Sequence, residues 1–302
     1  MHWVQISLET QRDTLESLEQ TLNDQGAVAI TYGDAADQPL FEPGPGDTPL
    51  WDTVLLQGLF AADQPIDEIL AQVNQSPALI APAKAEILED KDWSKEWMQH
   101  FKPIRCGERL WICPRWHEPP AQSQINLMLD PGMAFGTGTH PTTRLCLSWL
   151  DNQSQRDGDF QHSSVIDYGC GSGILAIAAL LLGCERAWAT DIDPLAIDAT
   201  HYNAQRNEIA LNDLECGLPH QVELPCADIL IANILAGPLV ELAPLMAAHC
   251  HVGGSLVLSG LLENQIETVT HAYLPWFDFA EPTLDDGWVM LNASRTNAAL
   301  KS

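Results

Sequence analysis

The stretch VIDYGCGSG, Val165–Gly173, decides the fold of this chain. Its apolar start predicts a buried β-strand, its three alternate glycines predict a turn, and the apolar residues that follow predict a helix. Glycine has no side chain and adopts backbone angles that other residues resist, so a ligand can lie directly against such a turn. The start of the helix offers free N–H groups to the same space. We expect a flat ligand, or one that bears a carboxylate, at this turn.

Strands and helices alternate from Ser164 onward, which predicts a doubly wound, mostly parallel sheet. The predicted strands are 164–168, 186–190, 220–223, 228–232 and 252–259. The predicted helices are 173–182, 194–206, 236–247 and 261–272. Two final strands, 276–281 and 287–293, have no helix between them, so we expect an antiparallel pair that closes one edge. The expected sheet therefore has seven strands.

The first part of the chain predicts a smaller α+β domain. Strands are expected at 2–8, 27–32, 51–60 and 83–88, with a helix at 10–24 that Thr10 caps and a second helix that has Pro65 in its first turn. This order, β-α-β-β-α-β, is that of the ferredoxin-like unit. It contains no glycine phosphate loop and no cluster of candidate catalytic residues, so we interpret it as a recognition domain. The predicted domains are 1–90 for recognition, 91–125 as a connecting segment with a charged helix at 89–100, and 126–302 for ligand binding.

Composition excludes several classes of protein. No run of eighteen apolar residues exists, so no membrane span is expected, and the amino terminus does not resemble a signal peptide, so we expect a cytoplasmic protein. The eight cysteines form no CxxC pair, which favours reduced core cysteines. The cluster His249–His251 has no second ligand pair at a suitable spacing, so no metal site is predicted.

The net charge of -27 comes from 41 acidic and 14 basic residues. Such a field repels nucleic acid and attracts basic partners. General solubility, or adaptation to a salty habitat, explains the same excess because the acids are spread along the whole chain. Both interpretations stay open on composition alone.

The spacing of the glycines narrows the choice of ligand. The pattern is D-x-G-x-G-x-G, whereas a nicotinamide fingerprint, G-x-G-x-x-G, needs a glycine where this chain has Ile174. The next predicted strand ends at Asp191, whose carboxylate is placed to accept hydrogen bonds from two ribose hydroxyls. Asp193 precedes Pro194, and we interpret it as the N-cap of the following helix. An adenosine ribose without a pyrophosphate is therefore indicated.

Asn233 follows the apolar run of another strand, at the carboxyl edge where open α/β sheets bind ligands. Its carboxamide can accept a hydrogen bond from an amine, although a helix cap is the alternative. The segment 130–143, DPGMAFGTGTHPTT, is rich in glycine and threonine and predicts a ligand-binding loop, followed by a helix that begins at Pro141. No proton-transfer role is assigned to His140 in this loop.

Together the turn, the ribose carboxylate and the edge asparagine resemble a class I S-adenosylmethionine-dependent methyltransferase. Four stretches, DPGMAFGTGTHPTT, VIDYGCGSGILAIAAL, DIDPLAI and ANILAGPL, occur in the order seen in the bacterial ribosomal protein L11 methyltransferase family. The stretches EDKDW and GERLWICP also match, and the resemblance covers nearly the whole chain. It departs from the family at 151–163 and in a shortened stretch near 207–220.

The resemblance implies a protein-lysine methyltransferase that uses S-adenosylmethionine. It would methylate the N-terminal α-amine and lysine ε-amines of ribosomal protein L11, up to trimethylation, and it would act as a monomer without contacting nucleic acid. The family's cofactor contacts correspond to Thr143, Gly169, Asp191 and Asn233, and Gly171 lies in the same turn. The first domain would recognise the ribosomal protein.

The expected reaction is the attack of a neutral amine on a sulfonium methyl group, with Asn233 as the catalytic residue that orients the amine. A glutamine or small-molecule N-methyltransferase is one alternative. Such glutamine enzymes carry an N-P-P-Y-like motif, where this chain has Asn233 followed by Ile234, Leu235 and Ala236. A cofactor-binding adaptor without catalysis is the other alternative, and an adaptor has no need to retain the residues of a methyl-transfer site.

Overall fold

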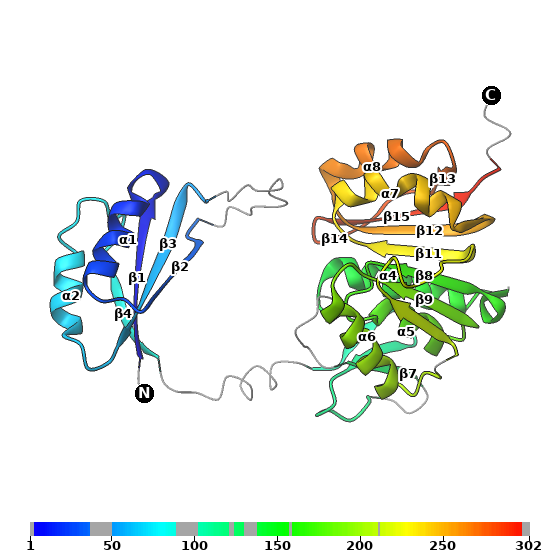
Figure 1. Ribbon diagram of the computed structural model, residues 1–302, viewed down its shortest axis with the longest axis horizontal. Helices are drawn as coiled ribbons and strands as arrows, with labels where there is room; N and C mark the ends of the chain where they lie inside the picture. The colour runs from blue at the N-terminus through cyan, green and yellow to red at the C-terminus, as the bar shows by residue number, and fades with distance from the viewer. Residues whose placement is uncertain are drawn as a thin grey trace. The chain divides into compact units, whose positions relative to one another are not determined.

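The computed structural model describes residues 3–36, 50–88, 102–120, 124–129, 138–156, 159–210 and 212–297. The chain divides into two compact units, Met1–Trp97 and Met98–Ser302, which are drawn in Figure 1. The helix expected at 89–100 and most of the glycine- and threonine-rich loop, residues 130–137, lie outside the described residues.

The first unit is an antiparallel sheet with both helices on one face (Figure 1). The strand order is β2-β3-β1-β4, which together with the order of elements along the chain confirms the ferredoxin-like fold. Its core lies between the sheet and the helices, because alternate residues of β1 and β3 are buried. The elements are β1 (Trp3–Gln11), the 3-10 helix η1 (Arg12–Thr14), α1 (Leu15–Asp24), β2 (Ala29–Asp34), β3 (Thr53–Ala61), α2 (Ile66–Val73) and β4 (Lys84–Leu88).

The expected start of the first helix was wrong. Thr10 lies in β1 opposite Val54 and is fully buried, and its hydroxyl donates to the Ala78 carbonyl at 3.0 Å. The ladder with β3 therefore continues past the residues that the alternating pattern indicated, and α1 begins at Leu15 with Thr14 as its N-cap.

A three-stranded sheet begins the described part of the second unit: β5 (Ile104–Cys106), β6 (Leu110–Cys113) and β7 (Ile125–Met128). β5 and β6 form an antiparallel pair around Gly107, and β7 lies parallel to β6. The fully buried Asp151, on helix α4 (Pro141–Ser154), accepts from the backbone N–H groups of Glu108 at 2.5 Å and Arg109 at 3.0 Å. This carboxylate therefore joins the small sheet to α4.

We expect Asp151→Ala to lower the free energy of unfolding of the second unit by about 2–4 kcal/mol, because two backbone N–H groups lose their acceptor and the Arg109 guanidinium, 3.4 Å away, loses its counter-charge. Differential scanning calorimetry measures the change. Asn152→Ala is the matched control, since Asn152 is exposed and adjacent, and it should shift stability by less than about 0.5 kcal/mol. Equal effects of the two substitutions would contradict the anchoring role.

The second unit contains the predicted doubly wound sheet, in the strand order β10-β9-β8-β11-β12-β15-β13. The first five strands are parallel. Strand β15 is antiparallel to β12 and, as expected, to β13. An eighth short strand, β14, pairs with β15 beyond the seven that were expected. The strands are β8 (Ser164–Tyr168), β9 (Arg186–Thr190), β10 (Leu214–Gly217), β11 (Ala227–Asn233), β12 (Cys250–Leu262), β13 (Phe277–Phe279), β14 (Thr283–Asp285) and β15 (Trp288–Arg295).

Helices cover both faces of this sheet (Figure 1). The side chains of β11 show why, since Ile229 and Ile231 enter one core while Leu230 and Ala232 enter the other. Besides α4, the helices are α5 (Ile174–Leu181), α6 (Pro194–Arg206), α7 (Ala236–Ala248) and α8 (Ile266–Tyr273), with 3-10 turns η2 (Asp159–His162) and η3 (Glu263–Gln265). No helix in the described ranges has the length and apolar character needed to cross a membrane.

The strand expected at 220–223 was wrong. The edge strand of the sheet is β10, which pairs with β9 from Leu214 to Gly217, and the chain turns immediately after it. Val222 is buried without belonging to a strand, and a β-carbon on Gly217 would lie 3.0 Å from its side chain. A single apolar residue that packs back on the sheet edge produced the misleading pattern.

Candidate functional site

A cavity of about 410 Å³ lies where the parallel strands β8, β9 and β11 end. This volume is in the range of small-molecule sites, roughly 300–1,000 Å³. Four of the five predicted site residues, Gly169, Gly171, Asp191 and Asn233, line it. The remaining lining residues are His140, Thr142, Ile234, Leu235, Gly260 and Trp288. The carboxyl edge of the sheet therefore brings together side chains from distant parts of the sequence.

The glycine turn has the backbone geometry that its sequence predicts. Gly169, Gly171 and Gly173 have φ angles of 81°, 54° and 75°, in the left-handed region that favours glycine. A β-carbon on Gly169 would collide with the side chain of Ile234. The Gly169 N–H donates to the Thr190 carbonyl at 2.7 Å, which fixes the turn against the end of β9. The turn is thus a rigid, side-chain-free wall of the cavity.

Asp167, in β8, connects the strand before the glycine turn to the helix after it. It is fully buried, and its Oδ2 accepts from the Ala176 N–H in the first turn of α5 at 3.1 Å. This helix N–H, which we expected to face a ligand, is therefore bound within the protein. Burial raises the pKa of Asp167 to about 7.

Asp191 connects the turn to the next strand. Its Oδ2 accepts from the Gly171 N–H at 2.9 Å and its Oδ1 accepts from the Asp193 N–H at 3.0 Å. A carboxylate oxygen can accept more than one hydrogen bond, so Asp191 retains acceptor capacity toward the cavity. Asp193 instead accepts from the Leu195 N–H at 2.9 Å as the N-cap of α6, which confirms the cap interpretation.

Asn233 is the last residue of β11, and its role as a helix cap is excluded because the N-cap of α7 is Leu235. Its Nδ2 donates to the Thr143 hydroxyl oxygen at 3.3 Å. Its Oδ1 is buried and has no hydrogen-bond partner within the described residues. Thr143 itself is fully buried and does not line the cavity. Its hydroxyl contacts Asn233 and not the cavity. The Asn233 carboxamide is therefore held by its nitrogen, and its buried oxygen needs a hydrogen-bond donor.

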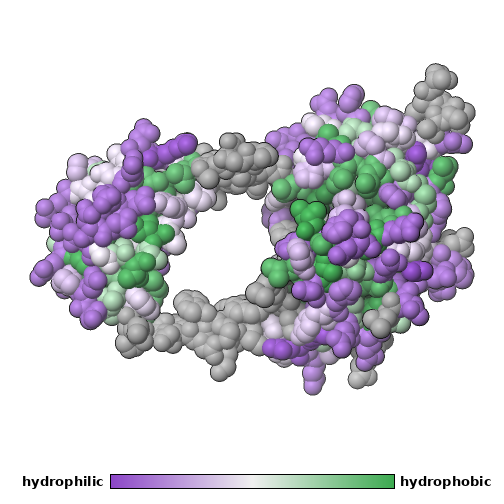
Figure 2. Space-filling model, viewed as in Figure 1, coloured by the Kyte–Doolittle hydropathy of each residue, from purple (hydrophilic) through white to green (hydrophobic). Residues whose placement is uncertain are grey.

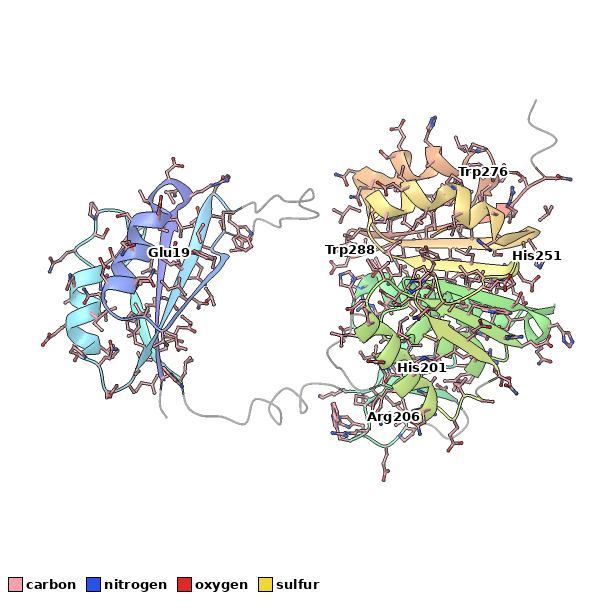
Figure 3. The ribbon with its side chains drawn as sticks, viewed as in Figure 1. Glu19, His201, Arg206, His251, Trp276 and Trp288 are labelled. Atoms are coloured by element: carbon pink, nitrogen blue, oxygen red, sulfur yellow. The ribbon has the colours of Figure 1, made fainter. Side chains whose placement is uncertain are left out.

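His140 and Trp288 form an aromatic wall of the cavity. Their rings meet edge to face with centroids 4.6 Å apart, and Figure 3 shows Trp288 beside β14. His140 Nδ1 lies 2.8 Å from the Thr142 hydroxyl oxygen at the start of α4. Burial, and then the charge of Arg144, lower the pKa of His140, so the neutral imidazole is favoured. Arg144 also pairs with Asp285 at 2.7 Å, which ties α4 to β14 next to this wall.

Sequence reasoning missed several lining residues. Gly260 has a φ of 88°, and the pairing of β12 with β15 shifts register between Ser259 and Leu261. A β-carbon there would collide with the backbone carbonyl of Ile234. An isolated glycine inside an apolar strand was a usable signal for this bulge. Trp288 carried no such signal. It lies at the start of a strand that was predicted to close one edge of the sheet, and nothing in the sequence placed that strand beside the site.

No group of three or more His, Cys, Asp or Glu side chains in the described part of the chain could hold a metal ion. The candidate site therefore consists of a glycine wall, a carboxylate, a carboxamide and two aromatic rings.

Comparison with known proteins places this arrangement in context. The family model described as ribosomal protein L11 methyltransferase (PrmA) matches residues 2–296. The ribosomal protein L11 methyltransferase of Cellvibrio japonicus is 50% identical over 299 residues, which cover 99% of this chain and 100% of that relative. The protein of the same name in Pseudomonas putida is 49% identical over 296 residues, covering 98% and 100%.

A solved structure is also similar. The ribosomal protein L11 methylase from Lactobacillus delbrueckii subsp. bulgaricus matches with a TM-score of 0.57 and 31% sequence identity, over 65% of this chain and 100% of that one. The similarity therefore extends from the sequence to the fold.

Proposed function

The chain belongs to the ribosomal protein L11 methyltransferase family, and on that premise we propose that it transfers methyl groups from S-adenosylmethionine to amines of ribosomal protein L11. The acceptors would be the N-terminal α-amine and lysine ε-amines, carried up to the trimethylated state. The observation that carries the proposal is Asn233, which lines the cavity and whose buried Oδ1 has no hydrogen-bond partner in the part of the chain that the structure describes.

The cavity residues fit the proposed cofactor. Gly169 lines the cavity without a side chain, which suits the close approach of a ligand. Asp191 can accept from ribose hydroxyls, and Gly171 would contact the cofactor in the same turn. Thr143 would act on the cofactor and the amine through Asn233, whose Nδ2 it fixes.

Bound S-adenosylmethionine would supply a methyl group on a positively charged sulfur, which then leaves as a neutral thioether. The protein has to bind the amine without its extra proton, since a lysine ε-amine is charged in water at neutral pH. Asn233 Oδ1 would accept a hydrogen bond from an N–H of the neutral amine and so orient the nitrogen lone pair for the transfer. Methyl transfer would form an N–C bond in place of the C–S bond, and the ammonium product of the first or second transfer would lose a proton to solvent. Alignment supplies most of the acceleration.

The first unit is proposed as the recognition domain for ribosomal protein L11, in the predicted arrangement of 1–90, 91–125 and 126–302. The excess of acidic residues supports a basic protein partner and disfavours nucleic acid. A monomer in the cytoplasm is part of the same proposal.

The experiment incubates the purified chain with unmodified ribosomal protein L11 and labelled S-adenosylmethionine, followed by mass spectrometry of the intact protein and its peptides. We expect successive gains of one methyl group at the α-amine and at lysines. A chain that binds the cofactor and leaves every candidate protein unmodified would instead support the adaptor alternative. Label on another protein or a small molecule, with ribosomal protein L11 unmodified, would support the alternative substrate class.

A further inference from the structure

A groove of about 710 Å³ lies on the first unit at the end of the sheet where α2 begins. Helix α2 packs on the core of this unit with Ile69 and Val73, which are buried. Beside the first turn of this helix, Ile87 of β4 is exposed, while Val4 of β1 is buried.

The floor of the groove is apolar. Val4 of β1 pairs with Ile87 of β4, and both side chains line the groove together with Ala85 and Ile66. Ile87 is 71% exposed, whereas Val4 is only 6% exposed. An isoleucine this exposed, beside other apolar side chains, indicates a surface that a partner covers.

Strand β4 is also an edge. In the order β2-β3-β1-β4 it pairs with β1 alone among the strands that the structure describes. Its outer backbone groups can therefore pair with an extended segment of another protein, a recurrent mode of peptide recognition. The groove would receive alternate side chains of such an added strand.

The charge around the groove selects the partner. Asp67 and Glu68, in the first turn of α2, line it. The described residues of this unit, 3–36 and 50–88, carry 11 acidic and 2 basic side chains, a formal charge of −9. The two basic residues, Arg12 and Lys84, do not line the groove. Figure 2 shows hydrophilic and hydrophobic residues side by side on the surface of this unit. An apolar floor with an acidic rim fits a segment that alternates apolar and basic side chains.

We propose that the groove between α2 and the edge of β4 docks an extended basic segment of the substrate protein. The segment adds to β4, places an apolar side chain over Ile87 and sets a lysine or arginine beside Asp67 and Glu68. This inference rests on the proposed function and names the surface by which the first unit holds the substrate.

The test compares substitutions in the full chain. Ile87→Asp is expected to raise the KM for ribosomal protein L11 about tenfold or more, as loss of a central contact does, while kcat and the Kd for S-adenosylmethionine stay unchanged. Val28→Asp is the matched control, because Val28 is 57% exposed in the same unit and does not line the groove. It should leave the KM at the wild-type value.

A second pair of variants tests the charge without adding any. Asp67→Asn combined with Glu68→Gln should raise the KM and weaken its dependence on salt. Asp13→Asn combined with Glu16→Gln makes the same charge change at the start of α1, outside the groove, and should do neither.

The outcomes separate this inference from the function on which it rests. A wild-type chain that leaves ribosomal protein L11 unmodified would contradict the proposed function. A wild-type chain that methylates it, with an unchanged KM for both groove variants, would overturn the docking site alone. Equal increases for Ile87→Asp and Val28→Asp would also overturn it, as would sedimentation showing that Ile87→Asp dissociates a dimer of this chain.

Discussion

Asn233→Ala is expected to transfer methyl groups about 100-fold more slowly than the wild-type chain at saturating cofactor and substrate. The substitution removes the buried Oδ1 that would orient the amine, and nothing else in the described residues occupies that place on β11. Single-turnover kinetics with labelled S-adenosylmethionine measures the loss. The Kd for the cofactor should change much less, because the glycine wall and Asp191 remain.

Asn233→Asp distinguishes orientation from charge. An aspartate keeps an acceptor oxygen at the same place, but its negative charge favours the protonated amine and so raises the pKa of the bound amine. Its activity profile should therefore move to higher pH, whereas Asn233→Ala should be slow at every pH.

Thr143→Val, which removes the acceptor of the carboxamide Nδ2, should slow transfer, and Thr143→Ser should restore it. Wild-type turnover by Asn233→Ala would remove the residue from the mechanism.

A comparison of the three methyl transfers tests directly whether Asn233 Oδ1 orients the amine. A dimethylated amine that has lost its proton has no N–H to donate, so Asn233 Oδ1 can orient only the first two transfers. Asn233→Ala should therefore slow the first two steps more than the third. Substrates prepared in each methylation state, compared by mass spectrometry, separate these steps.

The sequence predicted the parts of the site that regular backbone patterns control. The turn at Gly169, the carboxylate at Asp191 and the carboxamide at Asn233 each follow an apolar strand, and parallel strands end at one edge of the sheet. Positions that depend on packing between distant segments could not be predicted in this way. Thr143 is an example, since its burial behind Asn233 depends on how α4 crosses the end of β11.

The errors in the fold have the same origin. Continuous apolar runs located the buried strands of the main sheet, because helices cover both faces of these strands. Strand β10 lies at the sheet edge and is only four residues long, so its pattern was too weak to compete with the buried Val222 beyond it. Thr10 was assigned to a helix cap because its hydroxyl suits one, although tertiary pairing with β3 holds it in a strand.

Asp191→Ala is expected to raise the Kd for S-adenosylmethionine about 10–100-fold, because hydrogen bonds to a carboxylate contribute about 1.5–3 kcal/mol each and water replaces part of the loss. Isothermal titration measures the affinity, and turnover at saturating cofactor should fall much less. A cofactor analogue without the ribose hydroxyls should bind weakly to the wild-type chain and lose little further affinity in the variant, which assigns the effect to the ribose.

Asp193→Ala is the control that makes this prediction decisive. It removes the same charge two residues further on, and Asp193 caps α6 without lining the cavity. Asp193→Ala should lower the free energy of unfolding by about 1 kcal/mol, because α6 loses its N-cap, and should leave the Kd for the cofactor unchanged. Asp191 also accepts from the Gly171 N–H, so part of its effect reaches the ligand through the glycine turn. If the analogue lost as much affinity as the natural cofactor in Asp191→Ala, the turn would account for the whole effect and the ribose contact would be wrong.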